Sequence, residues 1–358
     1  MKLYKVVGIM SGTSLDGLDL AYCQLRRKKD QWEFEIKTTE SVTYSKEMQN
    51  ELKDAIHLSA EKLLLLHNEY GIRLGKNVKD FITQNDLEVD FIASHGHTSH
   101  HRPELGFTFQ LGSGQHLANA SGHKVICDFR SNDLALGGQG APLVPIGDRL
   151  LFSEYDFCLN LGGISNISFE SRGSRIAYDI GLANMILNYI TRKIGLDYDK
   201  NGALAKSGTI NPNMLKKLND LNYYLLPHPK SIGYEWFLEE VVPIVDDTED
   251  STENLLHTAV HHICEKIAQQ VALNSNKKTQ KLLITGGGAL NSFLIETIRQ
   301  KLSSNIDVVV PEKKLIEFKE ALVFAFMGVL RSEREVNVLK TVTGATRDSS
   351  SGVIFLPN

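Results

Sequence analysis

The chain of 358 residues is longer than one compact core usually accommodates, so two domains of ordinary size are expected. Hydrophobic residues make up 42% of the sequence and charged residues 23%, which is typical of a soluble globular protein. The net charge is −4 and no long basic run occurs, which argues against nucleic acid or an anionic membrane as a partner.

Cysteine usage and hydropathy indicate a cytoplasmic protein. The cysteines form no CxxC pair, which favours reduced interior residues over a disulfide framework. They are Cys23, Cys127, Cys158 and Cys264. No apolar segment approaches the roughly 18 residues of a membrane span. The short apolar stretch at the beginning runs directly into SGTSLDG, unlike a secretory signal.

The first 128 residues predict an α/β domain that opens with a β-hairpin. An apolar run from Leu3 to Met10 and an alternating run from Leu18 flank a turn rich in Gly, Ser and Asp. Hydrophobic periodicity places the later elements. They are strands at 32–38, 90–94, 107–111 and 124–127, and helices over 46–85 and about 113–120.

Residues 129–150 are expected to be a long irregular stretch, because Gly137, Gly138, Gly140, Pro142 and Pro145 interrupt regular structure. The domain boundary is placed near its beginning. The expected domains are residues 1–128, with the C-terminal tail as a candidate addition, and residues 129–358.

The second half repeats the opening pattern with a hairpin around residues 162–166, and a later strand is expected to end at Asp179. The remaining elements follow from periodicity. They are helices over 183–194, 253–274 and 317–331, and strands at 282–285 and 307–310.

Three glycine loops point to a nucleotide: SGTSLDG at 11–17, LGGISN at 161–166 and TGGGALN at 285–291. Main-chain N–H groups in such turns can converge on phosphate, and the carboxylate of Asp16 can hold Mg²⁺ through water. An ordinary polar turn is the alternative for each hairpin alone. The predicted nucleotide contacts are Gly12, Thr13, Ser14, Asp16, Gly17, Asp19, Gly162, Gly163, Asn166, Gly286, Gly287, Gly288 and Asn291.

The combination of these loops predicts the fold. Two facing hairpins can grip the phosphates of one nucleotide, and a strand–glycine–helix turn lets a base lie against the backbone. The chain lacks GxxxxGK[ST] and GxGxxG, so the P-loop and Rossmann alternatives lose support. This pattern is that of the actin, hexokinase and heat-shock-chaperone ATPases, and it predicts a two-domain actin-like (ribonuclease H-like) α/β fold with an interdomain cleft.

Longer motifs make the resemblance more specific. They include GIMSGTSLDGLD at 8–19, DFR..DLALGGQGAPLVP at 128–145, LNLGGISNI at 159–167, DKNGALAKSG at 199–208 and EALVFA at 320–325. The sequence resembles the anhydro-N-acetylmuramic acid kinases over essentially its whole length. Members of that family open the 1,6-anhydro bond of anhydro-N-acetylmuramate with water and phosphorylate O6 from ATP, giving N-acetylmuramate 6-phosphate in cell-wall recycling.

The resemblance implies roles for individual residues, with ATP and Mg²⁺ as cofactors. Asp179 resembles the general base, and an ionised carboxylate suits the activation of water. Arg130 and Asp133 border the substrate pocket, where Arg130 can contact the lactyl carboxylate or a phosphate. Glu320 reaches the sugar, although it could instead stabilise a helix N-terminus. The implied substrate contacts are Thr98, Arg130, Gln139, Gly140, Ala141 and Glu320.

The histidine-rich segment HGHTSHH admits two interpretations. Zinc usually takes three or four ligands from spaced positions, and the local clustering of His95, His97, His100 and His101 fits that poorly. The resemblance favours a sugar-binding loop in which Thr98 touches substrate.

Several positions depart from the family pattern and leave alternatives open. His97 stands where Gln is usual; Ile180, Leu182 and Ala183 replace Thr, Pro and Gly; and Tyr234 replaces Arg. The alternatives are a kinase for a related 1,6-anhydrosugar such as levoglucosan, a nucleotide-binding pseudokinase or sensor, and a metal-dependent hydrolase built on the histidines. A homodimer is the candidate assembly, since family members are often dimers.

Overall fold

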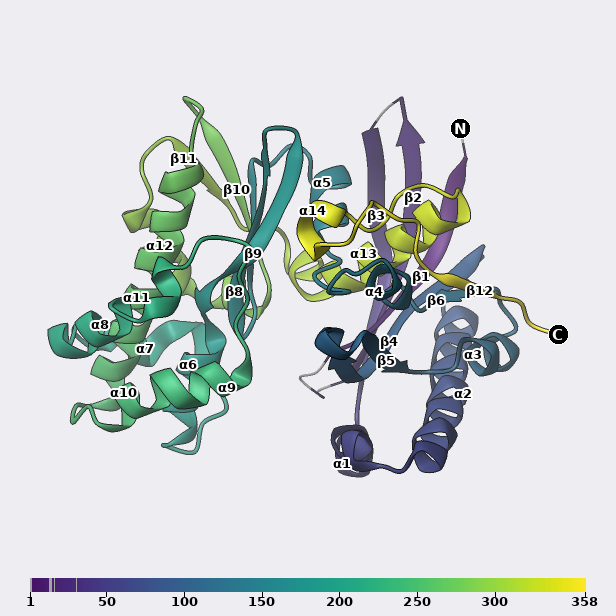
Figure 1. Cartoon of the computed structure of the whole chain (residues 1–358), viewed down its shortest axis with the longest axis horizontal. Helices are drawn as coiled ribbons and strands as arrows, with labels where there is room; N and C mark the ends of the chain where they lie inside the picture. The colour runs from purple at the N-terminus through teal and green to yellow at the C-terminus, as the bar shows by residue number, and fades with distance from the viewer. Residues whose placement is uncertain (1, 13–14, 16, 30) are drawn as a thin grey trace. The chain divides into compact units, whose positions relative to one another are not determined.

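A computed structural model of the chain describes residues 2–12, 15, 17–29 and 31–358 (Figure 1). The chain divides into two compact units: unit 1 is Met1–Phe152 with Phe318–Asn358, and unit 2 is Ser153–Glu317. The expected boundary after residue 128 differs from this division. Residues 129–152 belong with unit 1, where Asp133 accepts a hydrogen bond from Thr343 of the C-terminal segment.

Unit 1 is built on a mixed sheet with the strand order β12-β6-β4-β1-β2-β3, and β5 pairs with β4. The first three strands form an antiparallel meander, whereas β4 is parallel to β1 and β6 is parallel to β4. The strands are β1 (Leu3–Ser11), β2 (Gly17–Lys28), β3 (Gln31–Thr43), β4 (Phe91–Arg102), β5 (Phe107–Leu111), β6 (Val125–Cys127) and β12 (Val353–Phe355).

Unit 2 repeats this plan with the strand order β11-β10-β7-β8-β9. The strands β7, β8 and β9 form an antiparallel meander. Strand β10 then pairs in parallel with β7, and β11 pairs in parallel with β10. The strands are β7 (Phe157–Leu161), β8 (Ile164–Ser171), β9 (Ser174–Leu182), β10 (Gln280–Thr285) and β11 (Ile306–Val309). The duplicated order confirms the predicted actin-like (ribonuclease H-like) fold class.

Helices flank the sheets, and serine or asparagine side chains cap several of them. In unit 1, α2 and α3 lie side by side (Figure 1). The helices of unit 1 are α1 (Lys46–Asp54), α2 (Ala60–Gln84), α3 (Gly114–Ser121), α4 (Ser131–Ala135), α5 (Pro145–Leu150) and α14 (Lys340–Thr343). Those of unit 2 are α6 (Asn184–Arg192), α7 (Ala203–Ser207), α8 (Pro212–Asn219), α9 (Tyr234–Trp236), α10 (Val242–Asp246), α11 (Thr252–Asn274) and α12 (Ser292–Lys301). Helix α13 (Lys313–Ser332) contributes its residues from Phe318 onward to unit 1.

The core of unit 1 explains why the apolar run of β1 is interrupted by Gly8. Val7 and Ile9 of β1 pack in one cluster with Tyr70 and Leu74 of α2. On β1, Gly8 is required because a Cβ there would lie 2.0 Å from the main-chain oxygen of Ala321 in α13. The strand and the helix therefore pack backbone to backbone at this point.

Most predicted elements are confirmed, including both hairpins and the strand–glycine–helix turn. The four cysteines are free and buried, as their spacing predicted. Within the described ranges, no helix has the length and hydropathy needed to cross a membrane.

Four expectations about local structure were wrong. The histidine segment is not a loop: β4 continues to Arg102 because β5 pairs with it. Residues 129–150 contain the short helices α4 and α5. Asp179 does not end β9, which continues to Leu182 through its pairing with β8. Glu320 does not head its helix, because α13 already begins at Lys313.

Candidate active site

The first glycine hairpin joins β1, which ends at Ser11, to β2, which begins at Gly17. Met10 pairs with Asp19, and the main-chain N–H of Leu15 donates to the carbonyl oxygen of Gly12 at 3.4 Å. The carboxylate of Asp19 accepts a hydrogen bond from Ser41 at 2.6 Å. The predicted contacts Thr13, Ser14 and Asp16, including the predicted Mg²⁺ ligand, lie outside the described residues. Nucleotide contact by Gly12, Gly17 and Asp19 stays a prediction.

A buried hydrogen-bond chain supports the end of β1. Tyr44 donates to Ser11 at 2.8 Å, and its hydroxyl lies 2.6 Å from that of Tyr70. Ser11 Oγ lies 3.1 Å from Nδ1 of His97. Since Ser11 already accepts from Tyr44, its own hydroxyl proton is free to be donated to Nδ1 of His97. A neutral imidazole that accepts at Nδ1 carries its proton on Nε2. Burial lowers the pKa of His97 to about 4, so the ring is neutral near pH 7.

Arg130 is held in place by a histidine and a carbonyl group. Its Nε and Nη2 lie 3.0 and 2.8 Å from Nε2 of His95, and Nη1 donates to the carbonyl oxygen of Gly140 at 2.6 Å. Burial and the charge of Arg130 place the pKa of His95 well below its usual value. The imidazole is therefore neutral, and Nδ1 donates to the carbonyl oxygen of Gly96 at 2.9 Å. Burial lowers the pKa of Arg130 to about 10, which leaves the guanidinium charged.

The predicted sugar loop GGQGAP is organised by one buried carboxylate. Asp133 is fully buried and accepts hydrogen bonds from the main-chain N–H of Gly140 at 2.8 Å and from Thr343 Oγ1 at 2.7 Å. The N–H of Gln139 donates to the carbonyl oxygen of Thr343 at 2.8 Å. These bonds leave the side chain of Gln139 exposed and that of Ala141 half-buried.

Glu320 is an exposed residue within α13, and it lies within electrostatic range of Arg130 and Asp19. Although the residue as a whole is exposed, the surrounding protein removes water from its carboxyl group and raises the pKa of Glu320, while the charge of Arg130 opposes that rise. Unit 1 thus brings together one predicted nucleotide contact and two predicted sugar contacts. Thr98 is half-buried on β4, and its hydroxyl accepts a hydrogen bond from Gln110 at 3.3 Å.

The histidines of β4 act separately. His95 contacts Arg130, His97 contacts Ser11, and Nδ1 of His101 lies 3.1 Å from the hydroxyl of Thr108. In the part of the chain that the structure describes, no group of three or more His, Cys, Asp or Glu side chains is arranged to hold a metal ion. The histidine interpretation as a hydrolase centre therefore has no support from these residues.

In unit 2, Asp179 of β9 lies beside Asn166 on the adjacent strand β8. Asn166 of β8 pairs with Asn160 of β7 on one side and with Asp179 of β9 on the other. Oδ2 of Asp179 accepts a hydrogen bond from the main-chain N–H of Ile232 at 3.0 Å. Burial raises the pKa of this half-buried carboxyl group, and the Ile232 amide opposes the rise.

The two glycine loops of unit 2 lie next to each other. Asn184 holds the first of them, since its N–H donates to the carbonyl oxygen of Gly162 at 3.0 Å and its side-chain amide donates to that of Leu161 at 3.0 Å. A Cβ at Gly288 would lie 2.6 Å from the Cβ of Leu161. The predicted nucleotide contacts of these loops come together here: Gly162, Gly163, Gly286, Gly287 and Gly288.

Asn291, at the end of the glycine loop 285–291, has a structural role. Its Oδ1 accepts a hydrogen bond from the N–H of Leu294 at 3.0 Å and caps α12. The cap does not use the Nδ2 amino group of Asn291, which is the proposed donor to a nucleotide.

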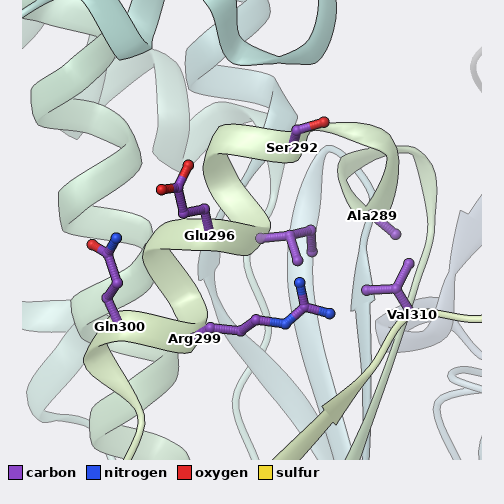
Figure 2. Close-up of a pocket in the computed structure, with 7 residues that line it drawn as sticks. Ala289, Ser292, Glu296, Arg299, Gln300 and Val310 are labelled. Carbon is purple, nitrogen blue, oxygen red and sulfur yellow. The ribbon is translucent and has the colours of Figure 1, made fainter.

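A pocket of about 480 Å³ begins where this glycine loop enters α12 (Figure 2). Figure 2 shows Arg299 extending toward Val310 along one wall, whereas Glu296 and Gln300 point away from it. The guanidinium of Arg299 donates to the carbonyl oxygen of Val308 at 3.4 Å. The lining residues are Ala289, Ser292, Ile295, Glu296, Arg299, Gln300 and Val310.

A family model described as anhydro-N-acetylmuramic acid kinase matches residues 4–357. The chain belongs to this family. Curated relatives carry the same description. Those from Sulfurimonas denitrificans, Francisella tularensis subsp. novicida and Aliivibrio fischeri are each 34% identical, with 96–99% of this chain and 97–100% of each relative covered. Membership confirms the predicted family and the predicted enzyme class, a kinase that takes its phosphoryl group from ATP.

Within the anhydro-N-acetylmuramic acid kinase fold, the sequence motifs predict Arg130 at the substrate pocket but do not predict that His95 holds it. The clustering of four histidines does not single out His95, and the resemblance places Asp133 only at the border of the substrate pocket. The available signal is the position of His95 in the segment HGHTSHH and of Asp133 in the motif DFR..D. The motifs do not indicate that a histidine accepts from Arg130, or that Thr343 contacts Asp133.

Proposed function

We propose that this protein opens the 1,6-anhydro ring of anhydro-N-acetylmuramic acid with water and phosphorylates O6 from ATP, giving N-acetylmuramic acid 6-phosphate. The observation that carries the proposal is the family match over residues 4–357. The duplicated glycine hairpins and the carboxylate of Asp179 support it.

Asp179 is the proposed general base. Burial raises its pKa, so the ionised carboxylate is a stronger base than an exposed aspartate. It takes a proton from the water that attacks C1. The C1–O6 bond breaks, O6 keeps the electron pair and attacks the γ-phosphorus, and ADP leaves. Phosphoryl transfer of this kind depends mainly on alignment and charge neutralisation.

In unit 1, Arg130 is the proposed ligand of the lactyl carboxylate. A guanidinium binds carboxylates through paired N–H groups, and the hydrogen bonds to His95 and Gly140 orient it in advance. Glu320 is proposed to accept hydrogen bonds from sugar hydroxyl groups. Gln139, Gly140 and Ala141 are proposed to line the sugar, and Thr98 to touch it.

The glycine loops are the proposed nucleotide site. Main-chain amides of the hairpins at Gly12–Gly17 and Gly162–Gly163 would bind phosphate oxygens. The adenine would occupy the pocket beside Ala289, where the planar guanidinium of Arg299 can stack on a base. Mg²⁺ prefers oxygen ligands; Asp16 is the ligand predicted from the sequence, and Asp19 of β2 offers further carboxylate oxygens. The ion would neutralise phosphate charge.

Coupled ADP release tests the substrate. We expect kcat/KM for anhydro-N-acetylmuramic acid to be well above kcat/KM for its analogue without the lactyl group and for levoglucosan. Asp179→Asn should lose activity by several orders of magnitude, whereas Asp307→Asn, at an exposed position of β11, should not. Full activity of Asp179→Asn would remove the proposed base.

The departures at 180–183 bear on the alternatives. Ile180, Leu182 and Ala183 are buried in the core of unit 2, so these side chains offer no group to a sugar. Tyr234 is 57% exposed. Because these three replacements lie in the core and not against a ligand, they give no reason to expect a sugar other than the family's substrate. ATP binding by calorimetry without any phosphorylated sugar would instead support a pseudokinase.

We further propose a cytoplasmic location, where ATP is supplied, and a homodimer. Leu64 and Leu65 of α2 are 56% and 55% exposed, and adjacent exposed leucines suit an interface between copies. Light scattering of the protein and of a Leu64→Glu, Leu65→Glu variant tests the dimer.

A further inference from the structure

The residues that follow α8 enclose the main chain of Asp179. Asp179 lies on β9, the edge strand of its sheet, and its N–H donates to the carbonyl oxygen of Lys230 at 3.2 Å. Its carbonyl oxygen accepts a hydrogen bond from the hydroxyl of Tyr223 at 2.7 Å. The N–H of Ile232 donates to Oδ2 at 3.0 Å. One segment, residues 222–232, therefore holds the backbone and one carboxylate oxygen of the same residue.

This segment is itself anchored to the core. The ring of Tyr223 packs on Trp236 with centroids 5.3 Å apart, and Nζ of Lys230 lies 4.5 Å from the ring centroid. Nζ of Lys230 also donates to the carbonyl oxygen of Tyr223 at 3.2 Å. The neighbouring Tyr224 is fixed separately, since its hydroxyl lies 2.8 Å from Nε2 of the buried His262. Tyr223 can thus hold Asp179 from a fixed position.

The carboxylate is held asymmetrically. Oδ2 is occupied by the Ile232 amide, and no donor to Oδ1 exists among the residues for which the structure gives positions. A carboxylate that is fixed through one oxygen presents the other in a defined direction. Proton abstraction from water needs such alignment, and small misplacements of a reacting group cost large factors in rate.

We propose that Tyr223 and the main-chain amide of Ile232 are positioning groups that orient Asp179 so that Oδ1 meets the water. This inference rests on the proposed role of Asp179 as the general base. Neither group touches substrate, and both act through Asp179.

The first test is Tyr223→Phe, which removes the hydroxyl but keeps the ring. We expect kcat to fall about tenfold, the value of one hydrogen bond, with KM for ATP and for the sugar within about twofold. Tyr224→Phe is the matched control, because it removes a buried hydroxyl from the next residue without touching Asp179. We expect its kcat to equal that of the unaltered enzyme. An equal kcat loss in both variants would overturn the proposal, since it would indicate general loosening.

The second test is a pH profile of kcat/KM for Ile232→Pro against Ile232→Val. Proline removes the N–H that favours the ionised form of Asp179, so the acid limb should move to higher pH, while valine keeps the N–H and should leave the limb in place. An unmoved limb in a folded Ile232→Pro protein would overturn the proposal. If this variant does not fold, Tyr223→Phe decides.

Asp179→Asn separates this inference from the proposed function. If Asp179→Asn keeps full activity, the base assignment fails and the positioning role fails with it. If Asp179→Asn is inactive while Tyr223→Phe keeps its full kcat, the base assignment stands and the positioning role of Tyr223 is overturned.

Discussion

Nε2 of His95 accepts from two nitrogens of Arg130, Nε at 3.0 Å and Nη2 at 2.8 Å. This arrangement needs a neutral imidazole, because a protonated ring has no acceptor. The carbonyl group of Gly96 takes the proton on Nδ1, and burial against Phe324 keeps the ring uncharged. The histidine therefore orients a charged guanidinium without neutralising it, and the charge stays available for an anionic ligand.

Removing this acceptor should weaken sugar binding. We expect His95→Ala to raise KM for the sugar about tenfold at unchanged KM for ATP, because Arg130 loses its fixed orientation. His95→Gln should restore part of the affinity, since an amide oxygen can accept from the guanidinium. His100→Ala, on the same strand, is the control. Steady-state kinetics with each substrate varied gives both constants; an unchanged KM for the sugar in His95→Ala would contradict the role.

The contact between Asp133 and Thr343 should contribute to stability. Thr343→Val keeps the side-chain shape and removes the hydroxyl that donates to a fully buried carboxylate. We expect the free energy of unfolding to fall by about 1–3 kcal/mol. Urea denaturation measures the change. Thr346→Val, at an exposed site, should shift the free energy of unfolding by less than about 0.5 kcal/mol; equal shifts in both would argue against the buried bond.

His97 should make stability depend on pH. Its pKa in the folded protein is about 4, below the unfolded value of 6.5, so the unfolded state binds more protons between these values. Stability is complete above about pH 6.5 and is lost as the pH falls toward 4. Glutamine does not titrate in this range. Between pH 7 and pH 5 the free energy of unfolding of His97→Gln should therefore fall by about 2 kcal/mol less than that of the unaltered protein. Urea denaturation at both pH values makes the comparison, and identical losses would exclude His97 as the source.

The pocket beside the glycine turn should bind adenine. Arg299→Ala removes the guanidinium along its wall and should raise KM for ATP about three- to tenfold without changing KM for the sugar. Ala289→Trp fills the pocket and should act more strongly. Arg192→Ala, an exposed arginine in the last turn of α6, provides the control. The assignment fails if Ala289→Trp binds ATP as tightly as the unaltered protein in calorimetry.

The sequence by itself determined the hairpins, the strand–glycine–helix turn and the family. These features depend on local signals, namely hydrophobic period, turn residues and contiguous motifs, which a chain carries along its length. The same signals predicted a loop for the histidine segment, which was wrong, because β4 continues to Arg102 only through its pairing with β5.

Only the tertiary structure decided which groups hold the predicted site residues. Thr343 reaches Asp133 across 210 positions of sequence, and Tyr223 reaches Asp179 across 44. A hydrogen bond of this kind leaves no periodic trace, since it depends on where two distant segments pack. The residue types at the site could therefore be read from the chain, whereas their orientation and charge state came from the neighbours that folding placed around them.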